Sequence, residues 1–282
     1  MMRLTPTVKH LLILNILVFI GINYFLSNEL RFIFYQKLSM YFPLNEFFEF
    51  WQIGTHMFMH GDFKHLLFNM FALWMFGNVV EQMFGQRKFL FFYLSCGIGA
   101  IFLHVFVQFF NFSEINNLFL NISHEEIVRR LNNIIRGEYI YEFCNTKFIR
   151  WFENNNEIFR NLHSCNAEYI LEEDYPNIIK LYEKVNFSTQ LLGASGAIMG
   201  ILVAFGMLNP NAELMLIFLP IPIKAKYFIP GIIALDLFSA ISGVSIFSPS
   251  NTAYIAHIGG ALTGFLMMYF WKKNQFDKYR WN

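Results

Sequence analysis

Apolar residues along the 282-residue chain gather into six segments that are separated by more polar stretches. The segments cover roughly 9–25, 63–80, 89–109, 194–208, 227–242 and 254–271. Several are shorter than the roughly 20 residues that a helix needs to cross a bilayer, which suits a bundle with dipping loops or a locally thinned membrane. The pattern therefore predicts an all-α membrane protein with six transmembrane helices.

Two regions interrupt the apolar pattern. Residues 28–54, after the first span, are rich in aromatic side chains but too charged to cross a membrane, so we expect an interfacial loop there. Residues 111–188, between the third and fourth spans, are polar and predict an ordered insert with short helices near 127–135 and 169–185. The expected organisation is a core at 1–110, the insert at 111–188, a second core part at 189–271 and a tail at 272–282.

Composition supports a membrane location and excludes other classes. The chain is 55% hydrophobic and 15% charged, whereas soluble domains carry about 25% charged residues. No phosphate-binding loop, basic tract or nucleic-acid motif is visible, so we expect membrane lipid and no nucleic acid as a partner. Residues 11–25 lack a small-residue cleavage site and are interpreted as a retained first span.

Basic residues predict the orientation of the bundle. Ten of them flank the spans on one side, which the positive-inside rule makes cytoplasmic: Arg3, Lys9, Arg87, Lys88, Lys224, Lys226, Lys272, Lys273, Lys278 and Arg280. Both termini are then cytoplasmic, and the aromatic loop and the insert face outward. On the cytoplasmic side, 214–223 predicts a short strand pair turned by Pro220 and Pro222.

The three cysteines give little information about redox chemistry. Cys96 lies in an apolar segment and is expected to be a buried, inert thiol. Cys144 and Cys165 both lie in the insert, where a disulfide and two free thiols are equally compatible with the sequence.

A serine at membrane depth is the first candidate for chemistry. Ser195 lies in Gly193-Ala194-Ser195-Gly196, at the outer end of the fourth span. Free backbone N–H groups at a helix N-terminus can stabilise an oxyanion, and the glycines allow a peptide to approach closely. Alternatively, Ser195 is a small packing residue, because this short motif alone has little specificity.

A histidine at the same expected depth strengthens the catalytic interpretation. His257 lies near the outer end of the sixth span, and Gly260 and Gly264 share its helical face. A glycine groove allows another helix to approach, so an imidazole could reach Ser195 and activate it. The alternative is a core histidine with its hydrogen bonds satisfied.

A third polar pair lies at the start of the second span. His65 and Asn69 are four residues apart and can both donate hydrogen bonds to an oxyanion. A metal site with His56 and His60 is the rival interpretation, but the sequence lacks the carboxylate of a zincin motif and further ligands nearby. We therefore expect no metal and no cofactor.

The three motifs together resemble the rhomboid family of intramembrane serine proteases. They are His65-x-x-x-Asn69, Gly193-x-Ser195-Gly196 and Ala256-His257 followed by Gly260-x-x-x-Gly264, in the family's order and on its second, fourth and sixth spans. The resemblance covers about 9–110 and 193–271 and leaves out the insert. It implies a six-helix rhomboid bundle in which the serine's span is short and central.

The resemblance also implies roles for individual residues. Ser195 would be the nucleophile and His257 the general base, in a dyad with no acidic third member. The Ser195 backbone N–H, His65 and Asn69 would form the oxyanion site. His60 would support an outer water-filled cavity, Trp51 would lie in the interfacial loop, and 245–251, with Phe247, would cap the entrance from lipid.

The chain departs from the family's pattern in three places. Gln52 follows the loop tryptophan where an arginine is frequent, and Met199 lies where an aromatic residue often stacks under the histidine. A thioether controls the position of an imidazole less well than a ring does. The third departure is the insert, which we expect to restrict or recruit substrates.

Three functions fit these observations to different degrees. The first is an endopeptidase that cleaves transmembrane protein substrates near their outer membrane boundary, in a multi-pass protein of the bacterial inner membrane. The second is a catalytically inactive relative that binds membrane segments. The third is a metal-binding transporter, which the absence of an inverted repeat disfavours. Asp236, inside the fifth span, has no expected catalytic role, and the oligomeric state is not predicted.

Overall fold

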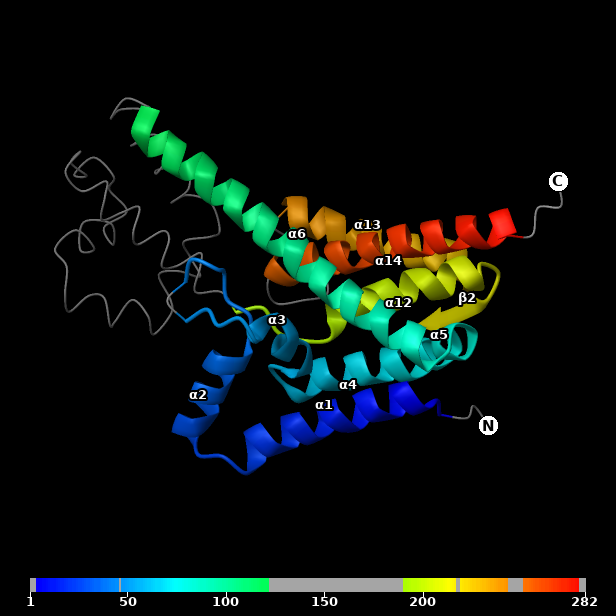
Figure 1. Cartoon of the computed structure of the whole chain (residues 1–282), viewed down its shortest axis with the longest axis horizontal. Coiled ribbons are helices and arrows are strands. Elements are labelled where there is room, and N and C mark those ends of the chain that lie inside the picture. Colours follow the sequence, from blue (N-terminus) through cyan, green and yellow to red (C-terminus); the bar gives the residue numbers. More distant parts are fainter. Residues whose placement is uncertain (1–3, 46, 122–189, 217–218, 243–250, 279–282) are drawn as a thin grey trace. The chain divides into compact units, whose positions relative to one another are not determined.

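The computed structural model describes residues 4–45, 47–121, 190–216, 219–242 and 251–278 (Figure 1). The chain divides into two compact units, Met1–Val107 with Phe187–Asn282, and Gln108–Asn186. Most of the second unit lies outside the described residues. This includes the helices expected in the insert as well as Cys144 and Cys165.

The described chain is mostly helical. Its first part contains α1 (Pro6–Tyr24), α2 (Asn28–Leu38), α3 (Gln52–Thr55), the 3-10 turn η1 (His56–Phe58), α4 (Phe63–Ala72), the π-helical turn η2 (Leu73–Gly77), α5 (Asn78–Phe84) and α6 (Gln86–Asn121). Its second part contains α12 (Ser195–Leu208), β1 (Glu213–Leu216), β2 (Leu219–Lys224), α13 (Ala225–Ser242) and α14 (Asn251–Lys278).

Three of the described helical segments are long and apolar enough to cross a membrane: α1, residues Gln86–Phe110 of α6, and α13. The helix α12 is apolar but shorter. An integral membrane protein follows from these segments, whereas the expected count of six spans stays a prediction.

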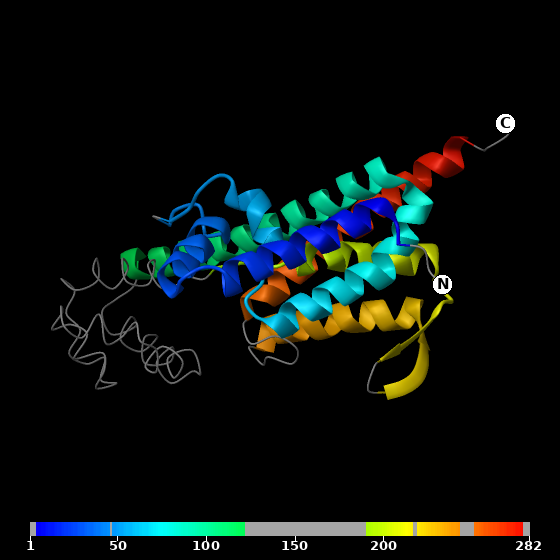
Figure 2. The ribbon, with the colours of Figure 1, turned by 90° about the horizontal axis from the view of Figure 1, so that it is seen from below.

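Helix α12 lies at the centre of the first unit, where it contacts α4, η2, α5, α13 and α14 (Figures 1 and 2). Every residue from Gly196 to Phe205 is buried. Because apolar side chains surround this helix on all sides, it can be shorter than a lipid-facing span and still be stable.

Helices α12 and α14 approach each other backbone to backbone. A Cβ atom added at Gly260 would overlap the Gly196 carbonyl group, and one added at Gly264 would lie 2.7 Å from the Gly200 Cα. Any side chain at these positions would push the helices apart. The glycine face expected beside His257 is thus the face against which α12 packs.

The expected short strand pair forms, but the prediction of its turn was wrong. Strands β1 and β2 are antiparallel, with Glu213 opposite Lys224 and Leu214 opposite Ile223. Pro220 and Pro222 lie within β2 rather than in the turn. A two-stranded sheet has only edge strands, so a proline can occupy β2 with its missing N–H on the unpaired side.

The N-terminus of α1 is capped by side chains from α5. Glu81 is 2% exposed, and its carboxylate accepts hydrogen bonds from the backbone N–H groups of Thr7 at 2.9 Å and Val8 at 2.8 Å. Asn78 accepts one from the Thr5 N–H at 2.9 Å. The free N–H groups at the start of α1 are therefore paired by α5, which is distant in sequence but adjacent in the fold.

Replacing Glu81 by glutamine is expected to lower the free energy of unfolding by about 1–3 kcal/mol, because an amide nitrogen would face buried donors. Thermal unfolding in detergent micelles measures this. The control is Glu213→Gln, an exposed residue of β1, which should unfold with the wild type. Equal stabilities of the two variants would contradict the capping role.

Candidate active site

The segment that leads into Ser195 is held by the first half of the chain. Leu191 and Met40 exchange two backbone hydrogen bonds of 2.8 and 2.9 Å, and the Gly193 N–H donates to the His56 carbonyl at 2.9 Å. Ser195 lies two residues after Gly193 and is the first residue of α12. Its hydroxyl therefore lies at a helix N-terminus whose backbone N–H groups lack helical partners.

Gly193 brings this segment against α4. Its φ angle is +114°, a value that side-chain-bearing residues rarely adopt. A Cβ atom added there would lie 2.7 Å from Cε1 and Nε2 of His65 and 3.6 Å from Nδ2 of Asn69. The backbone two residues before Ser195 thus lies beside both side chains expected to bind an oxyanion.

The position of His65 and Asn69 follows from how α4 begins. Asp62 is its N-cap, and the carboxylate accepts the His65 N–H at 2.9 Å. Asn69 lies one turn later and is 7% exposed. Among the described residues, its buried Nδ2 has no hydrogen-bond partner. An unpaired buried donor costs about 1–3 kcal/mol, so this amide is available to a substrate oxygen.

His60 lies in the turn before α4, where Tyr35 donates a hydrogen bond to its carbonyl at 2.6 Å. Its ring lies edge-on to that of His65, with the ring centroids 5.1 Å apart. Burial and, secondarily, His65 lower the pKa of His60 to about 3. Burial lowers the pKa of His56 to about 4. Both rings are therefore neutral at pH 7.

His60 also carries two buried ring nitrogens that have no hydrogen-bond partner within the described part of the chain. Buried polar atoms of this kind are commonly satisfied by water. This observation is compatible with the expected outer cavity.

His257 lies on α14 next to the contact between α12 and α14. The carbonyl of Ala256 lies 3.5 Å from the position of a Cβ added at Gly196, so the backbone next to Ser195 and the backbone next to His257 lie close together. Between described residues, no hydrogen bond joins the Ser195 hydroxyl to the imidazole, which is common before substrate arrives.

The imidazole of His257 instead contacts a carboxylate. Its Nδ1 lies 3.1 Å from Oδ2 of Asp236 on α13. The sequence-based interpretation gave Asp236 no catalytic role and expected no acid beside the histidine. A signal was present, because an ionisable residue inside a span is costly and therefore marks a functional site.

The remaining expected supporting residue on α12 is Met199. It lies one turn after Ser195, is 6% exposed and packs in the hydrophobic core. Cys96, on α6, is fully buried as expected and lies against Gly200 of α12. Both side chains fill the centre of the bundle.

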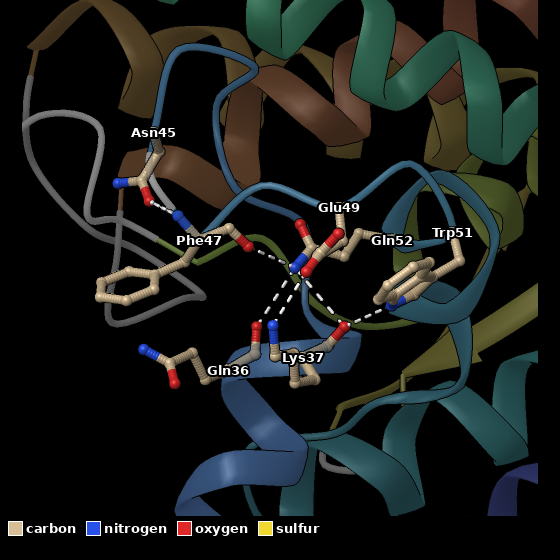
Figure 3. Close-up of polar contacts among 7 residues, drawn as sticks. All are labelled: Gln36, Lys37, Asn45, Phe47, Glu49, Trp51 and Gln52. Carbon is tan, nitrogen blue, oxygen red and sulfur yellow. Dashed lines mark hydrogen bonds and ion pairs between the residues drawn. The ribbon is translucent and has the colours of Figure 1, made fainter.

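The side chain of Gln52 holds the expected interfacial loop together at a position where the rhomboid pattern often has an arginine. The side chain is fully buried. Its Nε2 donates to the carbonyls of Phe47 at 2.9 Å and Gln36 at 3.2 Å (Figure 3). Its Oε1 accepts the Tyr41 N–H at 3.2 Å. One neutral amide thus joins the end of α2 to the loop, without burying a charge.

Trp51 and an ion pair hold the same region from outside. The indole Nε1 donates to the Lys37 carbonyl at 2.8 Å, and the Lys37 ammonium lies 2.8 Å from Glu49 (Figure 3). The expected interfacial loop at 28–54 therefore contains helix α2. Trp51 and Glu49, later in the loop, are bound to the C-terminal end of that helix.

A metal centre is not evident at these positions. Within the described ranges, no group of three or more His, Cys, Asp or Glu side chains is arranged to hold an ion.

Comparison with known proteins identifies the family. A family model described as the Rhomboid domain matches residues 48–113 and 173–274. The rhomboid protease GluP of Bacillus subtilis (strain 168) is 44% identical over 59 residues, which are 21% of this chain and 12% of GluP. YdcA of the same organism, also named a rhomboid protease, is 38% identical over 50 residues, 18% of this chain and 25% of YdcA. The chain thus covers less than two thirds of either relative. The family match nevertheless includes α4, α12 and most of α14, with all three motifs, and the chain belongs to the rhomboid family.

Proposed function

We propose that this chain is an intramembrane serine endopeptidase that hydrolyses peptide bonds in or near transmembrane segments of membrane proteins. The observation that carries the proposal is the meeting of three elements around Ser195. The Gly193 backbone lies against His65 and Asn69, and Gly196 and Ala256, which adjoin Ser195 and His257, lie close together. Relatives named as rhomboid proteases support the same activity.

The proposed reaction proceeds through an acyl-enzyme. The Ser195 oxygen attacks the scissile carbonyl carbon while its proton passes to Nε2 of His257, and the carbonyl electron pair moves to oxygen. The resulting oxyanion accepts hydrogen bonds from the Ser195 N–H, His65 and the unpaired Asn69 amide. Collapse breaks the C–N bond as His257 protonates the leaving amine, and a water then releases the acyl group by the same route.

The membrane arrangement is part of the proposal. It has six spans, both termini in the cytoplasm of a bacterium and Ser195 near the outer leaflet, and the flanking basic residues support this orientation. A transmembrane segment that unfolds easily would then reach Ser195 from lipid. Of the expected cap, 245–251 with Phe247, only Asn251 at the start of α14 belongs to the described residues.

Covalent labelling tests this proposal directly. A fluorophosphonate probe should label the purified wild-type protein in detergent micelles, because an activated serine attacks phosphorus. Ser195→Ala should remove the label completely. The matched control is Ser95→Ala on α6, a half-buried serine outside the site, which should be labelled like the wild type.

The outcomes separate the proposal from its alternative. Absence of labelling in the folded wild type would favour an inactive protein that binds membrane segments. Labelling that persists in Ser195→Ala would place the nucleophile elsewhere. Either result would contradict the endopeptidase assignment.

A further inference from the structure

Asp236 is a buried carboxyl group inside a membrane-spanning helix. It lies within α13, one of the segments able to cross a membrane, and is 3% exposed. The residues on either side, Leu235 and Leu237, are exposed apolar side chains that suit contact with lipid. Placing an ionised carboxyl group at such a position costs several kcal/mol unless a partner compensates for it.

The compensating partner is His257. Oδ2 of Asp236 lies 3.1 Å from Nδ1 of the imidazole, and the two side chains are 4% and 18% exposed. The placement follows from the packing of consecutive helices α13 and α14 (Figure 1). Asp236 precedes the end of α13 at Ser242 by six residues, and His257 follows the start of α14 at Asn251 by six. At about 1.5 Å per residue, both lie roughly 9 Å from the connection between the helices.

The contacted nitrogen decides the chemistry of the ring. A carboxylate can only accept hydrogen bonds, so Nδ1 of His257 must carry the proton. A neutral imidazole then keeps its lone pair on Nε2, the nitrogen that a serine hydroxyl needs as base. When Nε2 takes the serine proton, the ring becomes cationic and the adjacent carboxylate stabilises it.

We infer that Asp236 is a positioning residue that fixes the tautomer and orientation of His257, which makes the site a Ser195–His257–Asp236 triad rather than a dyad. This inference rests on the proposed function. It also explains how the ring is held without an aromatic residue at Met199, because the hydrogen bond that the ring donates to Asp236 on the neighbouring helix replaces ring stacking. The thioether of Met199 supplies packing and no direction.

The kinetic test compares Asp236→Asn, Asp236→Glu and the wild type in cleavage of a single-span model substrate in liposomes. Asp236→Asn should lower kcat at least about 10-fold with KM within about twofold, because the ring is misaligned while substrate binding is intact. Asp236→Glu, which keeps the charge, should recover part of kcat. The matched control is Ser239→Ala, a buried residue of α13 whose hydroxyl has no partner in the described structure; its kcat should equal that of the wild type.

The results separate positioning from a purely structural role. A loss of thermal stability in Asp236→Asn with kcat per folded protein unchanged would overturn the inference and leave the endopeptidase proposal intact. Equal losses of kcat in the Asn and Glu variants would also overturn it, since the charge would then have no effect. Failure of the endopeptidase proposal is recognised differently, by a wild type that neither cleaves nor reacts with fluorophosphonate.

A second measurement does not depend on turnover. Nitrogen-15 NMR of histidine-labelled protein, assigned by the loss of one pair of ring-nitrogen resonances in His257→Ala, reports which ring nitrogen carries the proton. The expected state of His257 in the wild type is Nδ1–H. A wild-type ring protonated on Nε2 alone would overturn the inference even in an inactive protein.

Discussion

Ser195→Ala and His257→Ala are each expected to lower kcat/KM by about 10⁴-fold or more, and the double variant is expected to lose no more than either single one. Residues that act as one unit lose their whole contribution when either is removed. The non-additivity is the informative part, because two independent sites would multiply their losses. Cleavage of a single-span substrate in liposomes by the four proteins measures it.

Two substitutions control for general damage to the bundle. Ser95→Ala and His10→Ala change a serine and a histidine outside the site, on α6 and on the exposed side of α1. Both should keep wild-type kcat/KM. Losses that multiply in the Ser195 and His257 double variant would show that the two residues do not act together, and the proposed mechanism would fail.

The elements that carry the candidate site are those that the sequence predicts best. Helix α12 was expected at 194–208 and begins at Ser195, because glycine and alanine precede a long apolar run. The face of Gly260 and Gly264 was also readable, since four-residue spacing places small residues on one side of a helix. The position of α12 and the glycine face of α14 can therefore be predicted from the local spacing of residues.

Contacts between distant segments could not be predicted in the same way. The bridge between Met40 and Leu191 joins residues 151 positions apart and orders the segment before Ser195. Its hydrogen bonds are between backbone groups, which carry no residue-specific signal. The π-helical turn at Leu73–Gly77, which interrupts the expected second span, could not be predicted either. Hydrophobic periodicity does not reveal one additional residue in a helical turn.

Asp236 and Gln52 show two kinds of missing information. The sequence marks Asp236 as unusual, but only the packing of α13 on α14 identifies the partner. Gln52 was treated as a departure from the family's pattern, whereas its buried amide bonds three backbone groups of the interfacial loop. A side chain's hydrogen-bonding capacity can be read from its type, but its partners depend on the fold.

Gly260→Ala is expected to lower the free energy of unfolding by about 3 kcal/mol or more, which is at the upper end for an overpacked core. The added methyl group would overlap the Gly196 carbonyl. Backbone cannot rotate away as a side chain can, so α12 and α14 must separate. Because Ser195 precedes Gly196 and His257 lies one turn before Gly260, the same separation should remove proteolytic activity.

Gly231→Ala is the matched control for this prediction. Gly231 lies in α13, and apart from its chain neighbours and its own helical backbone, no atom of the described residues lies within 4 Å of a Cβ added there. The same substitution should therefore be neutral or stabilise the protein by up to about 1 kcal/mol, because alanine favours a helix more than glycine does. Thermal unfolding followed by circular dichroism in detergent micelles compares the two variants. If Gly260→Ala unfolds together with Gly231→Ala, the two helices do not pack backbone to backbone, and the proposed pairing of Ser195 with His257 loses its structural basis.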